Sequence, residues 1–275
     1  MSAMQINNAT LINGSFHGAI SALDRGFAYG DGVFRTIKVV NGLPEQWPLH
    51  YQTLVRDCSA IGIVCPSAET FINDFELLAT VDDDVSVVKI IVTRGEGERG
   101  YKPPSITTPM RVMVKTKFPD YPEDYFIEGV HLHLCDTRIS HQPKLAGIKH
   151  LNRLENVLAR MEWHDPDLAE GLMLDIDDNV IECTAANLFA RFGDTLITPS
   201  LNKCGVAGIT RQRILSHAQT LKLKAKTEEM QLEKLLAADE VLICNSLFGV
   251  WQVRQISHKK WTKQTLANQL REAMK

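Results

Sequence analysis

The sequence predicts an α+β fold made of two domains. Its 275 residues are 44% hydrophobic and 23% charged, which is typical of a globular chain with one large or two moderate domains. Short strands and turns are mixed with helices, without the regular βαβ alternation of a doubly wound sheet. The segment 118–129 is rich in proline, aromatic and acidic residues and is predicted to be an interdomain linker. Residues 1–117 would then form a small α/β domain, and residues 130–275 a larger, β-rich domain with flanking helices.

In the first domain, apolar runs that end at Asn-Gly turns predict strands over 5–12 and 33–40. Apolar residues three or four positions apart predict a helix over 49–61. A run of β-branched residues predicts a buried strand over 85–92, and 111–117 would be its hairpin partner. These elements together predict a strand-rich opening with at least one covering helix.

The second domain shows the same two kinds of pattern, with turn residues between apolar runs. The expected strands cover 130–135, 171–176, 180–192, 195–198 and 240–244. The expected helices cover 152–163, 210–221 and 228–237.

Charge and cysteine content exclude several classes of function. Thirty basic and thirty-three acidic residues give a net charge of -3, so no overall positive field attracts nucleic acid or anionic lipid. No apolar run has the roughly 18 residues of a membrane-spanning helix, and the first residues lack the pattern of a secretory signal. The six cysteines form no C-x-x-C pair and are interpreted as reduced thiols. A cytoplasmic protein is expected.

Two groups of residues could carry chemistry in the second half of the chain. Lys149 follows small and apolar residues, and a lysine in such a pocket can act as an amine nucleophile or Schiff-base partner. Glu182 stands among apolar residues in an expected strand, where a buried carboxylate needs a facing cation or protonated ring nitrogen. A solvated lysine and an exposed glutamate are the alternatives at these two positions.

Three further segments contain candidate binding groups. Gly205 to Arg211 is a small-residue turn that leads into a helix, a common phosphate site, and Asn245-Ser246 offers a second set of donors. The glycine-rich segment 93–101 carries two arginines that suit a carboxylate, although a plain hairpin loop is the alternative. The strand segment 131–135 places two histidines and a cysteine on one face, but no further metal-site spacing is present and no metal is expected.

Read in order, these segments resemble the fold-type IV pyridoxal-phosphate enzymes, which include branched-chain and D-amino-acid transaminases and aminodeoxychorismate lyases. The likeness spans nearly the whole chain and is strongest to the lyases. It rests on four long motifs and on the segment 23–34. The motifs are RGEGERGY at 94–101, LAGIKHLNRLENVL at 145–158, ECTAANLF at 182–189 and ADEVLICN at 238–245.

The resemblance implies a role for each matching position. Lys149 would hold pyridoxal 5'-phosphate through its amine, and Glu182 would keep the pyridine nitrogen protonated, which makes the ring a better electron sink. The remaining residues fall into two groups. Cofactor binding would involve Asn187, Gly208, Ile209, Thr210, Asn245 and Ser246, and the substrate would be bordered by Tyr29, Arg94, Arg99, Tyr101 and Arg153.

One position departs from the family pattern. The family usually has a phosphate-binding arginine three residues after the histidine that matches His50, and this chain has Thr53 there. Arg56, three residues further along the same expected helix, is the candidate replacement.

By resemblance, the reaction would convert 4-amino-4-deoxychorismate to 4-aminobenzoate and pyruvate, a step of folate synthesis. The partners would be this small molecule and a second copy of the chain in a homodimer, with neither nucleic acid nor membrane. The main alternative is a branched-chain or D-amino-acid aminotransferase on the same scaffold. A non-catalytic protein with a degenerate cofactor pocket is a third possibility, which Thr53 favours.

Overall fold

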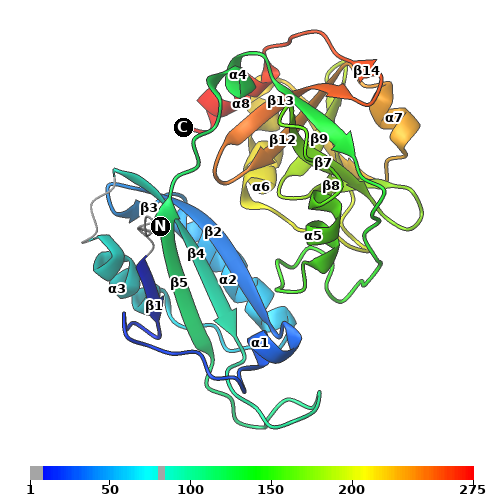
Figure 1. Cartoon of the computed structure of the whole chain (residues 1–275). Coiled ribbons are helices and arrows are strands. Elements are labelled where there is room, and N and C mark those ends of the chain that lie inside the picture. Colours follow the sequence, from blue (N-terminus) through cyan, green and yellow to red (C-terminus); the bar gives the residue numbers. More distant parts are fainter. Residues whose placement is uncertain (1–8, 80–83) are drawn as a thin grey trace, which may run out of the picture. The chain divides into compact units, whose positions relative to one another are not determined.

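The computed structural model describes residues 9–79 and 84–275. The chain divides into two compact units, one formed by Met1–Asp120 and Lys149–Asn152, the other by Tyr121–Ile148 and Arg153–Lys275 (Figure 1). The expected α+β class is confirmed, because strands and helices are segregated rather than alternating. Over the described residues, no helix is long and apolar enough to cross a membrane.

The first unit is a five-stranded antiparallel sheet in the order β1-β5-β4-β2-β3. Its strands are β1 (Ala9–Ile12), β2 (Gly32–Val40), β3 (Leu43–Pro44), β4 (Val85–Thr93) and β5 (Met110–Lys117). Its helices are α1 (Arg25–Tyr29), α2 (Trp47–Ala60) and α3 (Ala68–Ala79). The expected strand over 5–12 corresponds to β1, and its residues 5–8 lie outside the described part of the chain.

Two helices cover this sheet. α2 packs on β2, and α3 packs against β1 and β3 (Figure 1). The ring of Trp47 contacts Tyr51, Phe71 and Phe75 at centroid distances of 5.3 to 5.9 Å, so an aromatic cluster joins the two helices. The central strand β4 is the β-branched run that the sequence predicted, and it pairs with β2 over its whole length.

The second unit is a nine-stranded mixed sheet in the order β11-β10-β9-β12-β13-β6-β7-β8, with β14 paired to β13. Its strands are β6 (Val130–Leu134), β7 (Leu168–Leu174), β8 (Val180–Cys183), β9 (Asn187–Phe192), β10 (Thr195–Pro199), β11 (Lys224–Glu228), β12 (Glu240–Asn245), β13 (Gly249–Ile256) and β14 (Lys259–Lys260). Its helices are α4 (Glu123–Ile127), α5 (Leu154–Arg160), α6 (Ile209–His217), the 3-10 helix η1 (Ala218–Leu221), α7 (Leu232–Leu236) and α8 (Leu266–Ala273).

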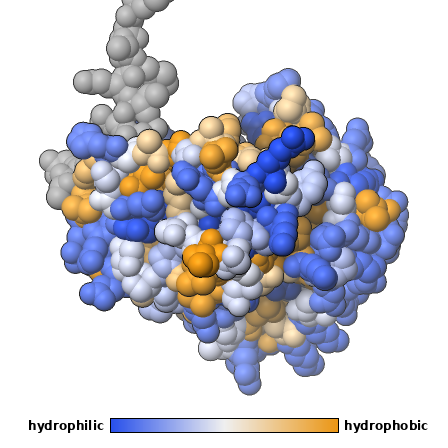
Figure 2. All heavy atoms as spheres, turned by 90° about the horizontal axis from the view of Figure 1, so that it is seen from below, coloured by the Kyte–Doolittle hydropathy of each residue, from blue (hydrophilic) through white to orange (hydrophobic). Residues whose placement is uncertain are grey.

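Both faces of this sheet are buried, so alternate residues of a central strand enter different cores. Val241 and Ile243 of β12 pack in a cluster with Trp251. Leu242 of the same strand packs in a second cluster that includes Leu270 of α8. The surface in view in Figure 2 is mostly hydrophilic, with hydrophobic side chains gathered in small groups.

The structure differs from the sequence prediction in two places. The segment expected as an irregular linker contains α4, and the chain passes between the units within that segment, after Asp120. Lys149–Asn152, which the sequence placed in the larger domain, groups with the first unit. The physical reason is backbone pairing, because Phe34 N–H donates to the Lys149 carbonyl at 2.9 Å and Leu151 N–H donates to the Gly32 carbonyl at 3.0 Å.

Candidate active site

Lys149 is fixed to the first unit by its main chain and side chain. Its N–H donates to Asp57 Oδ2 at 3.1 Å, and its carbonyl accepts the bond from Phe34. Its Nζ lies 4.6 Å from the centroid of the Phe34 ring, within the range of a cation–π contact. The lysine that the sequence singled out therefore has a defined backbone position beside β2.

Glu182 lies on β8 of the second unit with 4% of its surface exposed. Its Oε2 accepts hydrogen bonds from Val206 N–H at 2.9 Å and from Asn187 Nδ2 at 3.1 Å. A buried carboxylate is stable only when such donors replace the water it has lost. The structure therefore gives Glu182 the buried setting that the sequence pattern predicted.

Asn187 joins Glu182 to the turn before α6. Its Nδ2 also donates to the Val206 carbonyl at 2.8 Å, and its Oδ1 accepts from Gly208 N–H at 3.1 Å. A Cβ at Gly208 would collide with Asn187 Oδ1, so only glycine permits this close approach. Glu182, Asn187 and Gly208 thus form one hydrogen-bonded group within the second unit.

The first turn of α6 is suited to an anion. Gly208 is its N-cap residue in an extended conformation, with no side-chain cap hydrogen bond, and Thr210 is buried beside it. Uncapped N–H groups and the helix dipole favour a phosphate at such an end. The glycine cradle and the uncapped helix start, with a buried carboxylate nearby, fit pyridoxal phosphate, whose phosphate and ring nitrogen need these two kinds of partner.

Asn245 and Ser246 follow β12, but the Asn245 side chain is engaged in the turn. Its Oδ1 accepts from Leu247 N–H at 2.9 Å and Phe248 N–H at 3.0 Å, and its Nδ2 donates to the Ala185 carbonyl at 3.2 Å. Ser246 is half-buried next to it. Of this pair, Ser246 therefore remains the better candidate donor to a phosphate.

The predicted substrate loop places two tyrosines together. Tyr29 Oη accepts from Gly100 N–H at 3.1 Å, and the rings of Tyr29 and Tyr101 lie 5.4 Å apart. Tyr101 is 85% exposed and Arg99 is also exposed. These three side chains lie at the surface of the first unit, where a ligand can reach Tyr101 and Arg99.

Arg94 is placed differently from the other loop residues. It is 8% exposed, donates from Nε and Nη2 to Asp31 at 2.7 and 2.9 Å, and donates to the carbonyls of Ile61 and Gly62. Arg25 Nε donates to the same carboxylate at 2.8 Å. Burial acts to raise the pKa of Asp31, but these two arginines outweigh it and hold that pKa below its ordinary value. The contacts give Arg94 a part in fixing the loop to the end of α2.

Arg56, the candidate replacement for the family's phosphate arginine, is half-exposed and donates to Asp57 Oδ1 at 2.8 and 3.1 Å. Sequence reasoning missed a second guanidinium at Asp57, that of Arg35, which is 3% exposed. A signal for it was present, because Arg35 occupies the same side of β2 as the buried Val33 and Ile37. An arginine on the apolar side of a strand needs a buried partner, and Asp57 is that partner.

Arg153 lines a cavity of about 470 Å³ in the second unit, together with Asn156, Arg160 and Thr184. One guanidinium nitrogen of Arg153 donates to the Ile148 carbonyl at 2.9 Å. Arg160, which sequence reasoning did not single out, adds a second guanidinium to this cavity. The volume is within the range of small-molecule sites.

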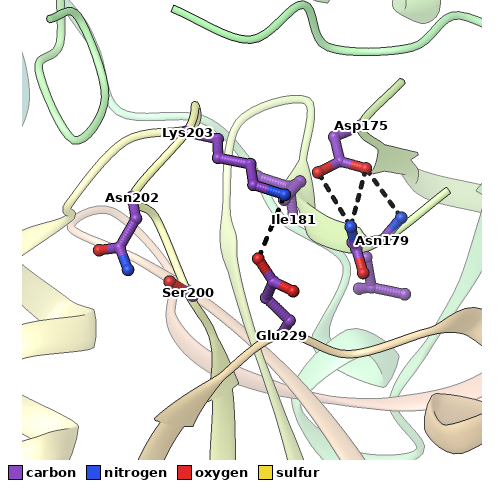
Figure 3. A pocket seen from close by; sticks show the side chains of 8 residues that line it. Asp175, Asn179, Ile181, Ser200, Asn202, Lys203 and Glu229 are labelled. Carbon is purple, nitrogen blue, oxygen red and sulfur yellow. Dashed lines mark hydrogen bonds and ion pairs between the residues drawn. The ribbon is translucent and has the colours of Figure 1, made fainter. Parts of the chain in front are cut away.

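A second cavity in this unit is much smaller, about 10 Å³, and has room for about one water molecule. Figure 3 shows the charged side chains that line it, with Lys203 Nζ 3.3 Å from Glu229 Oε1 and Asp175 bonded to Asn179. It is too small for a cofactor or substrate.

The histidine and cysteine segment of β6 is used in hydrogen bonding. His133 and Cys135 lie near Glu162, whereas His131 is exposed. Glu162 accepts from His133 Nε2 at 3.2 Å and also from the backbone N–H groups of Asp136 and Thr137. Its oxygens therefore already have protein partners.

The comparisons with known proteins agree with this geometry. A model of the family described as amino-transferase class IV matches residues 32–256. The chain belongs to the class IV aminotransferase family. The aminodeoxychorismate lyase of Vibrio harveyi is 38% identical over 234 residues, which cover 85% of this chain and 86% of that protein.

Solved structures of class IV aminotransferase relatives share the fold over nearly all of the chain. The 4-amino-4-deoxychorismate lyase from Pseudomonas aeruginosa is 40% identical, with a TM-score of 0.91 over 96% of this chain and 97% of that one. A branched-chain amino acid aminotransferase from T.th., solved with pyridoxamine 5'-phosphate, is 20% identical, with a TM-score of 0.83 over 96% and 92%. The expected fold-type IV architecture is confirmed, and the cofactor of the class IV family is pyridoxal 5'-phosphate.

Proposed function

We propose that this chain is a lyase that converts 4-amino-4-deoxychorismate to 4-aminobenzoate and pyruvate in folate synthesis. The observation that carries the proposal is the likeness to two lyases at 38% and 40% identity over most of the chain. It is supported by Lys149, Glu182 and the α6 start, the parts a pyridoxal-phosphate enzyme needs. Bound pyridoxal phosphate would accept the electrons released at the substrate carbon.

Each protein group has a task in this proposal. Lys149 would bind the cofactor through Nζ, and the freed amine would take the proton from the carbon that carries the substrate nitrogen. It would then return a proton to the departing pyruvate unit. Glu182 would hold a proton on the pyridine nitrogen, and the uncapped N–H groups after Gly208 would bind the phosphate. Asn187 would act by holding Glu182 and the turn together.

The two substrate carboxylates require cationic groups. Arg99 and Arg153 are the better candidates, because Arg94 is buried among Asp31 and two carbonyls. Tyr29 and Tyr101 would border the substrate beside Arg99. Arg56 would serve the cofactor phosphate from α2.

The deciding experiment is incubation of the cofactor-loaded protein with 4-amino-4-deoxychorismate and no amino acceptor. We expect 4-aminobenzoate and pyruvate in equal amounts. Lys149→Ala should abolish both products, whereas Lys144→Ala, an exposed lysine five residues earlier, should retain them. An aminotransferase would need a keto acid and would give no pyruvate from this substrate, and a protein that takes up no pyridoxal phosphate would be the non-catalytic alternative.

We also propose a cytoplasmic homodimer. The six cysteines are free, as expected in a reducing compartment. The short helix α5 exposes large apolar side chains, with 68% of Leu154 and 64% of Met161 accessible, and an apolar helix face of this kind favours burial against a second subunit. Sedimentation equilibrium should give twice the chain mass, and Met161→Glu should shift the protein toward monomer.

A further inference from the structure

Lys149 lies at the end of a chain of buried charges in the first unit. Asp57 on α2 is fully buried and accepts hydrogen bonds through both oxygens. Oδ1 receives the guanidinium of Arg56, while Oδ2 receives both Arg35 Nη2 and the Lys149 backbone N–H. One carboxylate oxygen therefore links the backbone of Lys149, ninety-two residues away in the chain, to a buried arginine of β2.

The charges around this point are unevenly placed. Arg35 is buried, and its Nε has no hydrogen-bond partner among the described residues. Burial lowers the pKa of Arg35, and the negative charge of Asp57 opposes that change. His50 on α2 stays neutral above acidic pH, because burial and the charge of Arg35 lower its pKa to about 3. Lys89 of β4 places its Nζ 4.8 Å from the same Phe34 ring as Lys149. A hydrogen bond with Cys65 and burial raise the pKa of the Cys58 thiol, which stays neutral.

We propose that Asp57 is a positioning residue for Lys149 and that Arg35 holds the Asp57 carboxylate in place for this task. The inference rests on the proposed function, in which Lys149 carries the cofactor and moves the proton. The Lys149–Asn152 segment is held by main-chain bonds to β2 and by this side-chain bond to α2. Without the carboxylate, the Lys149 N–H loses its acceptor and the lysine loses a fixed backbone angle, to which proton transfer is sensitive.

The test uses the cofactor-loaded enzyme and three variants: Asp57→Asn, Arg35→Met and Asp74→Asn. Asp74 is the matched control, because it is 2% exposed, lies on α3 of the same unit and pairs with Arg111 at 2.6 Å. The first readout is the pH midpoint of the visible absorption change of the bound cofactor, which reports the proton on the nitrogen of Lys149. The second is kcat and KM for product formation.

Asp57→Asn leaves Arg35 without a counter-charge, so the midpoint should move to lower pH by about one pH unit. Arg35→Met removes a positive charge, so the midpoint should move to higher pH. Asp74→Asn should leave it unchanged. Asp57→Asn should also lower kcat about ten- to a hundredfold with KM nearly unchanged, because the amide keeps the fold but holds the lysine less well.

Equal midpoints in the wild type and Asp57→Asn would overturn the proposal, as would the same loss of kcat in Asp74→Asn. If Asp57→Asn does not fold, the direction of the shift in Arg35→Met decides. Failure of the wild-type protein to take up pyridoxal phosphate would refute the proposed function itself, whereas uptake with unshifted midpoints would refute only the role of Asp57.

Discussion

Replacing Glu182 by glutamine should separate its electrostatic task from its structural one. The amide oxygen of glutamine can accept the same two hydrogen bonds, from Val206 N–H and Asn187 Nδ2, that Oε2 accepts now. We therefore expect Glu182→Gln to change the free energy of unfolding by only about 1 kcal/mol. Glu182→Ala should cost about 2 to 4 kcal/mol, because it removes a charged hydrogen bond and leaves the buried Val206 N–H without an acceptor.

Turnover should fall far more than stability in Glu182→Gln. Removing one preorganised polar group from a reacting centre commonly costs about 3 kcal/mol of transition-state stabilisation, which is about a hundredfold in rate. Urea unfolding of the cofactor-free protein and product formation by the loaded enzyme measure the two effects. Glu240→Gln is the control, since Glu240 is a buried carboxylate of the same unit that pairs with Arg191. Wild-type turnover in Glu182→Gln would refute the assigned role.

Two further predictions concern the turn and the loop. Gly208→Ala should lower cofactor affinity at least about tenfold, because its Cβ meets Asn187 Oδ1, and the loss should be smaller in an Asn187→Ala background; equal losses in the two backgrounds, measured by cofactor titration, would contradict the steric reason. Asp31 has a lowered pKa in the folded state, so its ion pairs with Arg25 and Arg94 contribute stability that is present above the unfolded pKa of about 3.8 and lost as pH falls below it. Asp31→Asn should be less stable than the wild type at pH 7 by about 2 to 4 kcal/mol, with the difference shrinking between pH 5 and 3 in urea titrations.

Local pattern was sufficient to predict the elements whose burial follows a simple period. The β-branched run of β4 and the apolar spacing of α2 are examples, because their residues face a core on a regular side. Strand β11 (Lys224–Glu228) was not predicted, since it is an exposed edge strand of mostly charged residues that exists through parallel pairing with β10. The expected helix over 228–237 is reduced to α7, Leu232–Leu236, because β11 uses Glu228.

Residue types were a weaker guide to the candidate site than to the fold. An arginine on a glycine-rich loop favours a substrate-binding role, but Arg94 meets Asp31, sixty-three residues earlier in the chain, and is buried with it. Arg35 has the opposite history, because the strand period places it with the core and nothing local reveals its partner. Both cases depend on long-range pairing of charges, which a single sequence does not show.

Asn187 offers the sharpest test of how the second unit assembles its part of the site. Its Nδ2 lies 3.1 Å from Glu182 Oε2, so Asn187→Asp would place a second carboxylate within hydrogen-bond distance of the first. Two carboxylates this close do not both ionise without a large penalty, so one of the pair takes a raised pKa. At low pH the protonated member can donate to the other and restore the present arrangement, whereas at high pH repulsion drives Glu182 away from the turn. We therefore expect the cofactor affinity of Asn187→Asp to approach that of the wild type near pH 5 and to fall below it progressively toward pH 8. A constant ratio of the two affinities over this range would show that Asn187 does not hold Glu182 in position.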